Sequence, residues 1–66
     1  MSTKNKLCYH TVIAGLTIEL RQWGKDAFTV QYGKAVTGKI SYQQACLDLG
    51  ASIIHALACE GKLDNG

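Results

Sequence analysis

The segment ISYQQACLDLGASIIHALACEG, which ends at Gly61, constrains the fold more than any other part of the chain. Ser41 followed by Gln44 has the spacing of a helix-capping box, and glycine is the residue that most often ends a helix. The segment therefore predicts a helix over about 42–60. A helix of this length has to bury one side, and this one carries apolar residues on more than one.

Two apolar stripes run along the predicted helix at about 100° per residue. The first is wide enough to cover a small sheet and comprises Tyr42, Ala45, Cys46, Leu49, Ile53, Ala56 and Leu57. The second lies roughly 150° further around the helix and comprises Leu47, Ala51, Ile54 and Ala58. Either the chain's own loops cover the second stripe, or another helix packs on it. Because a short chain has little material to cover two helix faces, the second stripe predicts a homodimer interface or a docking site for a partner.

Upstream of the helix, apolar and polar residues alternate with a period of two, which is typical of half-buried strands. This alternation covers residues 8–14, 16–21 and 27–32. The turn residues in QWGKDA join the last two runs into a β-hairpin. Gly15 either bends one long strand or turns between two, because glycine permits both. The following GKAVTGKI predicts a short third strand or an irregular connection.

The pattern predicts one α+β domain, in which a small antiparallel sheet of two to three strands, a β-hairpin plus a short strand, packs against one C-terminal α-helix. The expected boundaries are a frayed N-terminus at 1–7, the sheet at 8–40, the helix at 41–61 and a polar tail at 62–66. A chain of 66 residues is near the size at which one core only marginally stabilises a fold.

The composition, with 47% apolar and 18% charged residues, is that of a soluble globular protein. Three cysteines, Cys8, Cys46 and Cys59, make an odd number, and MSTKNKLCYHTV has no apolar run of signal-peptide length. We therefore expect free thiols and a cytoplasmic location. Asp48 and His55 interrupt the most apolar segment, so we expect no membrane span.

The cysteine and histidine spacing gives little support for chemistry. Cys8 and His10 lie close in sequence, as do His55 and Cys59, but Cys46 points about 140° away from Cys59 on the predicted helix. No group that would orient a nucleophile is identifiable. We expect no catalytic residue, no metal, no cofactor and no small-molecule substrate.

The charged residues are unevenly distributed along the chain. Residues 1–40 carry six basic side chains against two acidic ones, a net of +4, whereas residues 41–66 carry Lys62 against Asp48, Glu60 and Asp64, a net of −2. A polyanion could use the first half, and a basic groove of a protein could use the second.

Small size, separated charge and surplus apolar helix surface resemble the accessory proteins of phages and mobile elements, including anti-CRISPR inhibitors. The resemblance implies a protein of the host cell cytoplasm that binds a larger host protein or nucleoprotein complex and occludes it. Either Asp48, Glu60 and Asp64 would then imitate nucleic-acid phosphates toward a basic groove, or the basic hairpin would engage an acidic groove. The residues expected to contact the partner are Arg21, Trp23, Lys25, Lys34, Lys39 and Asp48.

A second interpretation is a DNA-binding module. The element order from Leu16 to Ala58 resembles plant AP2-type and integrase arm-binding domains, which lay a three-stranded sheet in the major groove. Arg21, Lys25, Lys34 and Lys39 would contact the nucleic acid. Against this, the chain has one arginine for the sheet face, and Glu19 lies at the middle of that face. Trp23 is either a lid over the core residues Leu20 and Phe28 or an exposed anchor at the hairpin end.

Overall fold

The computed structural model describes residues 5–63, and residues 1–4 and 64–66 lie outside the described part. The described residues form four strands and one helix: β1 (Lys6–Ile13), β2 (Leu16–Gly24), β3 (Ala27–Tyr32), β4 (Ala35–Val36) and α1 (Tyr42–Cys59).

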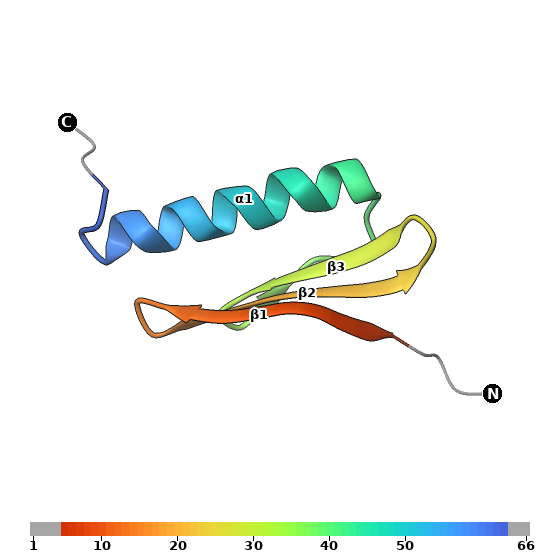
Figure 1. The fold of residues 1–66 in the computed structure, drawn as a ribbon, viewed down its shortest axis with the longest axis horizontal. Helices are drawn as coiled ribbons and strands as arrows, with labels where there is room; N and C mark the ends of the chain where they lie inside the picture. The colour runs from red at the N-terminus through yellow and green to blue at the C-terminus, as the bar shows by residue number, and fades with distance from the viewer. Residues whose placement is uncertain (1–4, 64–66) are drawn as a thin grey trace.

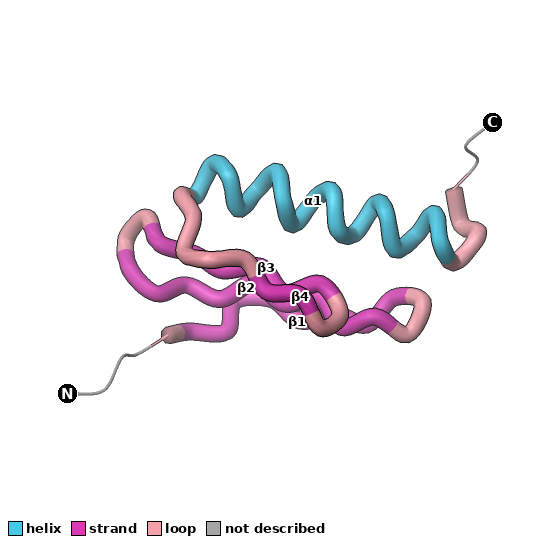
Figure 2. The backbone as a smooth tube through the Cα atoms, turned by 180° about the vertical axis from the view of Figure 1, so that it is seen from behind, coloured by secondary structure: helices cyan, strands magenta, loops and turns pink. Residues whose placement is uncertain are grey.

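The strands form one antiparallel sheet in the order β1-β2-β3-β4, and α1 covers one face of it (Figure 1). We call the covered face the inner face and the opposite one the outer face. Figure 2 shows the short β4 beside β3 at one edge, so that β1 forms the other edge. The predicted α+β class with a C-terminal helix is confirmed, but the predicted count of two to three strands was too low.

The additional strand follows from the turn at Ala14 and Gly15. Both residues adopt the left-handed conformation, with φ of 55° and 75°. Two successive left-handed residues form the type I′ turn that closes a two-residue β-hairpin, and Ile13 pairs directly with Leu16 across it. The chain therefore turns at Gly15 rather than bending, and the alternating residues before it form a strand of their own.

The N-terminal boundary also differs from the prediction. β1 begins at Lys6 rather than at Cys8, so the expected frayed region at 1–7 is too long. Its residues 1–4, like residues 64–66 of the predicted polar tail, lie outside the described part. The pairing of β1 with β2 shifts between Leu7 and Tyr9, which makes Cys8 an extra residue in a β-bulge.

The core lies between the inner face and α1. Its buried side chains are Ile18, Phe28, Val30, Ala45 and Ala56. The two helix residues are alanines, which let α1 pack closely on the larger side chains of β2 and β3. The first helix stripe faces these strands in its central part. Two residues of that stripe, Tyr42 at the first position of α1 and Cys46, remain exposed.

Local signals define both ends of α1. Ser41 is the N-cap, and its hydroxyl accepts a hydrogen bond from the backbone N–H of Gln44 at 3.1 Å. The Gln44 side chain does not reach back to the cap; it donates to Asp48 Oδ1 at 2.9 Å, so only half of the predicted capping box forms. At the other end Gly61 has φ of 81°, and the N–H of Lys62 donates to the carbonyl of Leu57, as in a Schellman motif.

Two further hydrogen bonds fix α1 over the sheet. The backbone N–H of Tyr42 donates to Asp26 Oδ1 in the β2–β3 turn at 2.8 Å. At the other end, the N–H of Ala14 in the β1–β2 turn donates to Glu60 Oε2 at 3.2 Å. The β2–β3 turn thus holds the beginning of the helix, and the β1–β2 turn holds its end. Within residues 5–63, no helix has both the length and the apolar character needed to cross a membrane.

Candidate functional site

The second helix stripe lies on the side of α1 that faces away from the sheet. We call Leu47, Ala51, Ile54 and Ala58 the outer helix stripe. Leu47 is 63% exposed and Ile54 is 59% exposed, whereas the opposite side of the helix buries Ala45 and Ala56. Ala51 is also exposed, and Ala58 is half-buried. No described loop covers Leu47, Ala51 or Ile54, so the alternative that the chain covers its own stripe is wrong for these three residues. The predicted dimer through the stripe stays a prediction.

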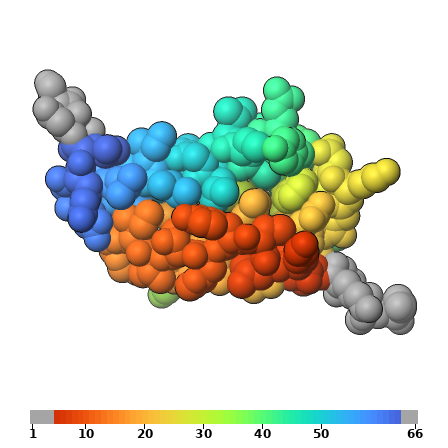
Figure 3. All heavy atoms as spheres, in the orientation of Figure 1, coloured from red at the N-terminus to blue at the C-terminus, as the bar shows by residue number. Residues whose placement is uncertain are grey.

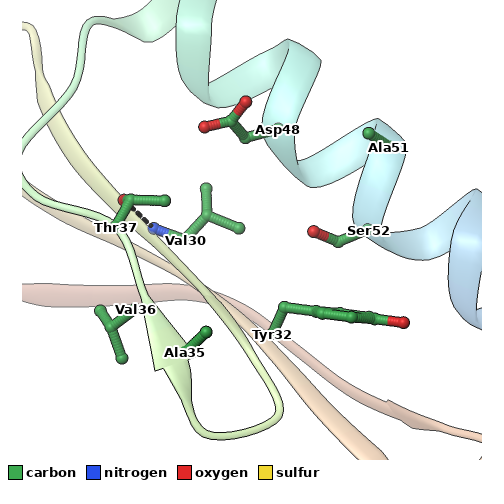
Figure 4. Close-up of a pocket in the computed structure, with 8 residues that line it drawn as sticks. All are labelled: Val30, Tyr32, Ala35, Val36, Thr37, Asp48, Ala51 and Ser52. Carbon is green, nitrogen blue, oxygen red and sulfur yellow. Dashed lines mark hydrogen bonds between the residues drawn. The ribbon is translucent and has the colours of Figure 1, made fainter.

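A pocket of about 300 Å³ opens beside this stripe, between α1 and the β3–β4 edge of the sheet (Figure 4). Val30, Tyr32 and Ala35 line it from the sheet, and Asp48, Ala51 and Ser52 line it from the helix. Its walls are mostly apolar, with the Asp48 carboxylate and the Ser52 hydroxyl on the helix side. Ala51 belongs both to the pocket and to the outer helix stripe, so the two form one continuous surface.

Asp48 is the charged group of this surface. Its Oδ1 accepts a hydrogen bond from the Gln44 side chain, and among the described residues it forms no ion pair. Figure 4 shows the carboxylate at the wall of the pocket, above Val30 and Thr37. A carboxylate in this position is able to accept a basic side chain from another molecule. Of the other acidic residues that were expected to bind a partner, Glu60 holds the β1–β2 turn, and Asp64 lies outside the described part.

On the outer face, Arg21 is already engaged by neighbouring groups. Its Nε lies 3.4 Å from Glu19 Oε1, and its Nη1 donates to Asn5 Oδ1 at 2.7 Å. Glu19 Oε2 also lies 3.8 Å from His10 Nε2. The Glu19 carboxylate therefore orients the chain's one arginine along the sheet. The negative charge of this carboxylate also opposes the approach of a phosphate.

Trp23 also lies on the outer face. Its indole N–H donates to Thr29 Oγ1 at 2.9 Å, and Lys39 Nζ lies 5.0 Å from the ring centroid in a cation–π contact. Thr29 points away from the core, because its strand neighbours Phe28 and Val30 are buried on the inner face. The interpretation of Trp23 as a lid over the core is therefore wrong.

The remaining predicted basic residues do not gather into one patch. Lys25 lies in the β2–β3 turn and Lys34 in the β3–β4 turn, at opposite ends of β3. A six-residue strand separates its ends by about 20 Å. The structure brings Lys39 to Trp23 but leaves Lys25 and Lys34 apart from each other.

His55 contacts Tyr32 and Cys59. The Tyr32 hydroxyl and His55 Nδ1 are hydrogen-bonded at 2.6 Å, and Cys59 Sγ lies 3.9 Å from the same nitrogen. In residues 5–63 no three His, Cys, Asp or Glu side chains are placed to hold a metal ion. The Tyr32–His55 contact was not predicted, because the sequence does not reveal how the helix is aligned along the strand.

No protein-family model, curated protein or solved structure matches this chain. The function therefore has to be inferred from its surfaces.

Proposed function

We propose that the protein is a non-enzymatic binding protein that docks on a larger protein or nucleoprotein complex and inhibits it by steric occlusion. The observation that carries this proposal is the continuous apolar surface made by the outer helix stripe and the adjoining pocket. Contiguous exposed apolar surface with a polar rim is typical of protein interaction sites. Here it includes Leu47 and Ile54, two of the most exposed large apolar side chains among the described residues.

The shape of this surface suggests how the partner is bound. Leu47, Ala51 and Ile54 follow one another at helical spacing, as do the anchors of an amphipathic helix that enters an apolar groove. Asp48 lies beside them without a basic partner among the described residues. The groove of the partner therefore carries apolar side chains for the stripe and a lysine or arginine that reaches Asp48.

The separation of charge supports an inhibitor of a nucleic-acid-handling complex. Residues 41–66, which supply the helix side of the docking surface, carry three acidic side chains against one basic one. A positively charged channel, such as that of a CRISPR–Cas effector, would attract this side of the molecule. An accessory protein of a phage or mobile element, acting in the host cell cytoplasm, is the class that fits best.

The DNA-binding alternative has less support. A module that reads DNA needs free Arg and Lys side chains on the surface that meets the groove. On the outer face, Glu19 engages Arg21, and Lys39 lies over Trp23. A gel shift of duplex DNA that weakens steeply with rising salt would restore this alternative.

The test compares capture of the partner by three forms of the tagged protein. The wild type and Thr17→Glu, which adds the same charge on the outer face, should both retain the partner from lysate of the native host. Ile54→Glu should lose it, because a charge is placed in the apolar contact. With the purified partner, we expect Ile54→Glu to raise the Kd by roughly 10- to 100-fold. The wild type should inhibit the partner's activity, whereas Ile54→Glu should not.

Equal binding of Ile54→Glu and the wild type would contradict the proposal, because the outer helix stripe would then play no part. Asp48→Asn tests the polar part of the surface separately. It should weaken binding of a basic partner while leaving the fold unchanged, since Asp48 forms no ion pair among the described residues.

A further inference from the structure

The open edge of β1 is unlike the other edge of the sheet. β4 is two residues long, whereas β1 has eight residues and pairs only with β2 among the described strands. Figure 3 shows β1 as an uninterrupted orange-red band along the near side of the molecule. Proteins usually protect a long edge strand with charges, proline or a covering segment. From Tyr9 to Ile13, β1 has no proline, lysine, arginine or acidic residue.

The backbone groups that face this edge can be assigned. The carbonyl of Thr17 accepts a hydrogen bond from the β3 side at 2.8 Å. Because hydrogen-bonding direction alternates along a strand, its neighbour Ile18 directs its groups to β1, where it pairs with Thr11. Thr11 therefore uses its backbone groups on β2. His10 and Val12, on either side of it, direct their N–H and C=O groups to the open edge.

We propose that β1 is the interface for a second copy of this chain, with the two β1 strands antiparallel and Thr11 of each copy opposite Thr11 of the other. In this register His10 pairs with Val12 of the second copy, and Val12 pairs with its His10. All four residues direct their N–H and C=O groups to the interface, so the pairing completes four backbone hydrogen bonds. The two copies form one continuous eight-stranded sheet, with both α1 helices on the same face.

The bulge fixes this register. Cys8 interrupts regular pairing, so the regular part of β1 is Tyr9–Ile13, and Thr11 is its central residue. In the proposed register, the twofold axis that relates the two copies passes between their Thr11 residues. If the axis passed between the two His10 residues instead, two imidazoles would lie directly opposite each other and the bulge would enter the interface. With Thr11 at the axis, Tyr9 pairs with Ile13 of the second copy on the inner face. Aromatic and β-branched residues are a favourable cross-strand pair.

Exposed apolar side chains support the same interface. Val12 is 57% exposed on the outer face, and Tyr9 is 44% exposed although it lies on the inner face. Tyr9 is left open because α1 packs mainly on β2 and β3 and covers less of β1. The second copy supplies the apolar neighbours that the helix does not provide.

Charges at the ends of the paired strands are complementary. In the proposed register, β1 of one copy runs on past the β1–β2 turn of the other, where Glu60 accepts the N–H of Ala14. Lys6 is the residue that comes to lie beside that turn. Its side chain is on the inner face, because Lys6 pairs with Gln22, and Gln22 pairs in turn with the buried Phe28. Lys6 of each copy thus approaches Glu60 of the other, twice in the dimer.

Cysteine cross-linking tests the register. In a background with Cys8, Cys46 and Cys59 changed to serine, Thr11→Cys places two thiols directly opposite each other across the axis. Their Cα atoms would be about 4.5 Å apart, within the range for a disulfide. The matched control is Val12→Cys, whose two copies are diagonal neighbours about 7–8 Å apart, beyond that range. Under mild oxidation, Thr11→Cys should migrate at twice 7.1 kDa on a non-reducing gel, and Val12→Cys should not.

Sedimentation equilibrium tests the interface without cross-linking. The wild type should approach twice 7.1 kDa as its concentration rises. Val12→Pro removes a donor at the open edge and no hydrogen bond to β2, so it should remain a monomer with an unchanged circular dichroism spectrum. Ile54→Glu should dimerise like the wild type, whereas a dimer formed through the outer helix stripe, the interface expected from the sequence, would be lost in this variant. This result separates the β1 interface from the outer helix stripe and from the proposed function that rests on it.

The proposal is overturned if the wild type is a monomer at millimolar concentration, or if Ile54→Glu abolishes the dimer while Val12→Pro keeps it. Equal cross-linking of Thr11→Cys and Val12→Cys would also overturn it, because it would show no preference for the Thr11 register. If Val12→Pro does not fold, the pair of cysteine variants still decides between the outcomes.

Discussion

Ile18 is the residue on which the fold most depends. It has no exposed surface and lies on β2, one of the two central strands, below α1. Small domains bury a smaller fraction of their surface than large ones, so one large central side chain contributes a substantial part of the total stability. A chain of 66 residues has a free energy of unfolding of about 3–10 kcal/mol at ~0.05–0.15 kcal/mol per residue.

We predict that Ile18→Ala lowers the free energy of unfolding by about 2–5 kcal/mol, through lost burial and the cavity that remains. The measurement is urea unfolding followed by circular dichroism. Leu47→Ala is the matched control, because it also shortens an aliphatic side chain but at a position that is 63% exposed. It should change the free energy of unfolding by less than about 0.5 kcal/mol. Equal effects of the two substitutions would show that the core is not where the structure places it.

At the scale of elements, α1 depends on contacts at its ends as well as on its apolar face. The charged side chains within α1 are limited to Asp48, and its last turn carries no basic residue to complement the helix dipole. The Ser41 cap and the hydrogen bonds from Tyr42 to Asp26 and from Ala14 to Glu60 therefore define where the helix begins and ends over the sheet.

We predict that Ser41→Ala lowers the free energy of unfolding by about 1 kcal/mol, because the N–H of Gln44 loses its acceptor. Ser41→Asp should keep the cap and the stability, since aspartate accepts the same hydrogen bond. Both are measured by urea unfolding at one protein concentration. Equal loss in the two variants would mean that the Ser41 hydroxyl acts through some contact other than the cap.

The features that the sequence predicts best are those that local signals decide. Ser41 and Gly61 define the helix ends by capping chemistry that needs no tertiary context, and alternation identifies the strands. The extra strand was uncertain because glycine at position 15 permits a bend or a turn. The left-handed conformation of Ala14, a residue that rarely adopts it, decides the outcome.

Local sequence signals do not predict the features that depend on how distant elements align. The outer helix stripe follows from helical spacing alone and was predicted residue by residue. The pocket that adjoins it forms only when β4 lies beside β3, and the engagement of Arg21 by Glu19 depends on the tilt of side chains across the outer face. The open edge of β1 follows from the strand order, which the alternation of residues does not specify.

At the scale of the whole molecule, the proposed dimer would bury additional apolar surface in a chain that is too short to form a large core. Joining two sheets at β1 extends the sheet under both helices and covers Tyr9 and Val12. It also directs both outer helix stripes away from the same face of the sheet. A partner with two matching grooves would then bind the dimer more tightly than a single copy, because the second contact is intramolecular.

Association of folded chains makes thermal stability depend on protein concentration, because only the folded state presents the open β1 edge. We therefore predict that the Tm of the wild type rises as its concentration increases, whereas the Tm of Val12→Pro stays constant. Ile54→Glu is the control, since it changes the outer helix stripe and should keep the concentration dependence of the wild type. The measurement is thermal unfolding by circular dichroism over a wide concentration range. A wild-type Tm that is independent of concentration would mean that the small core holds the fold alone and that no second copy binds β1.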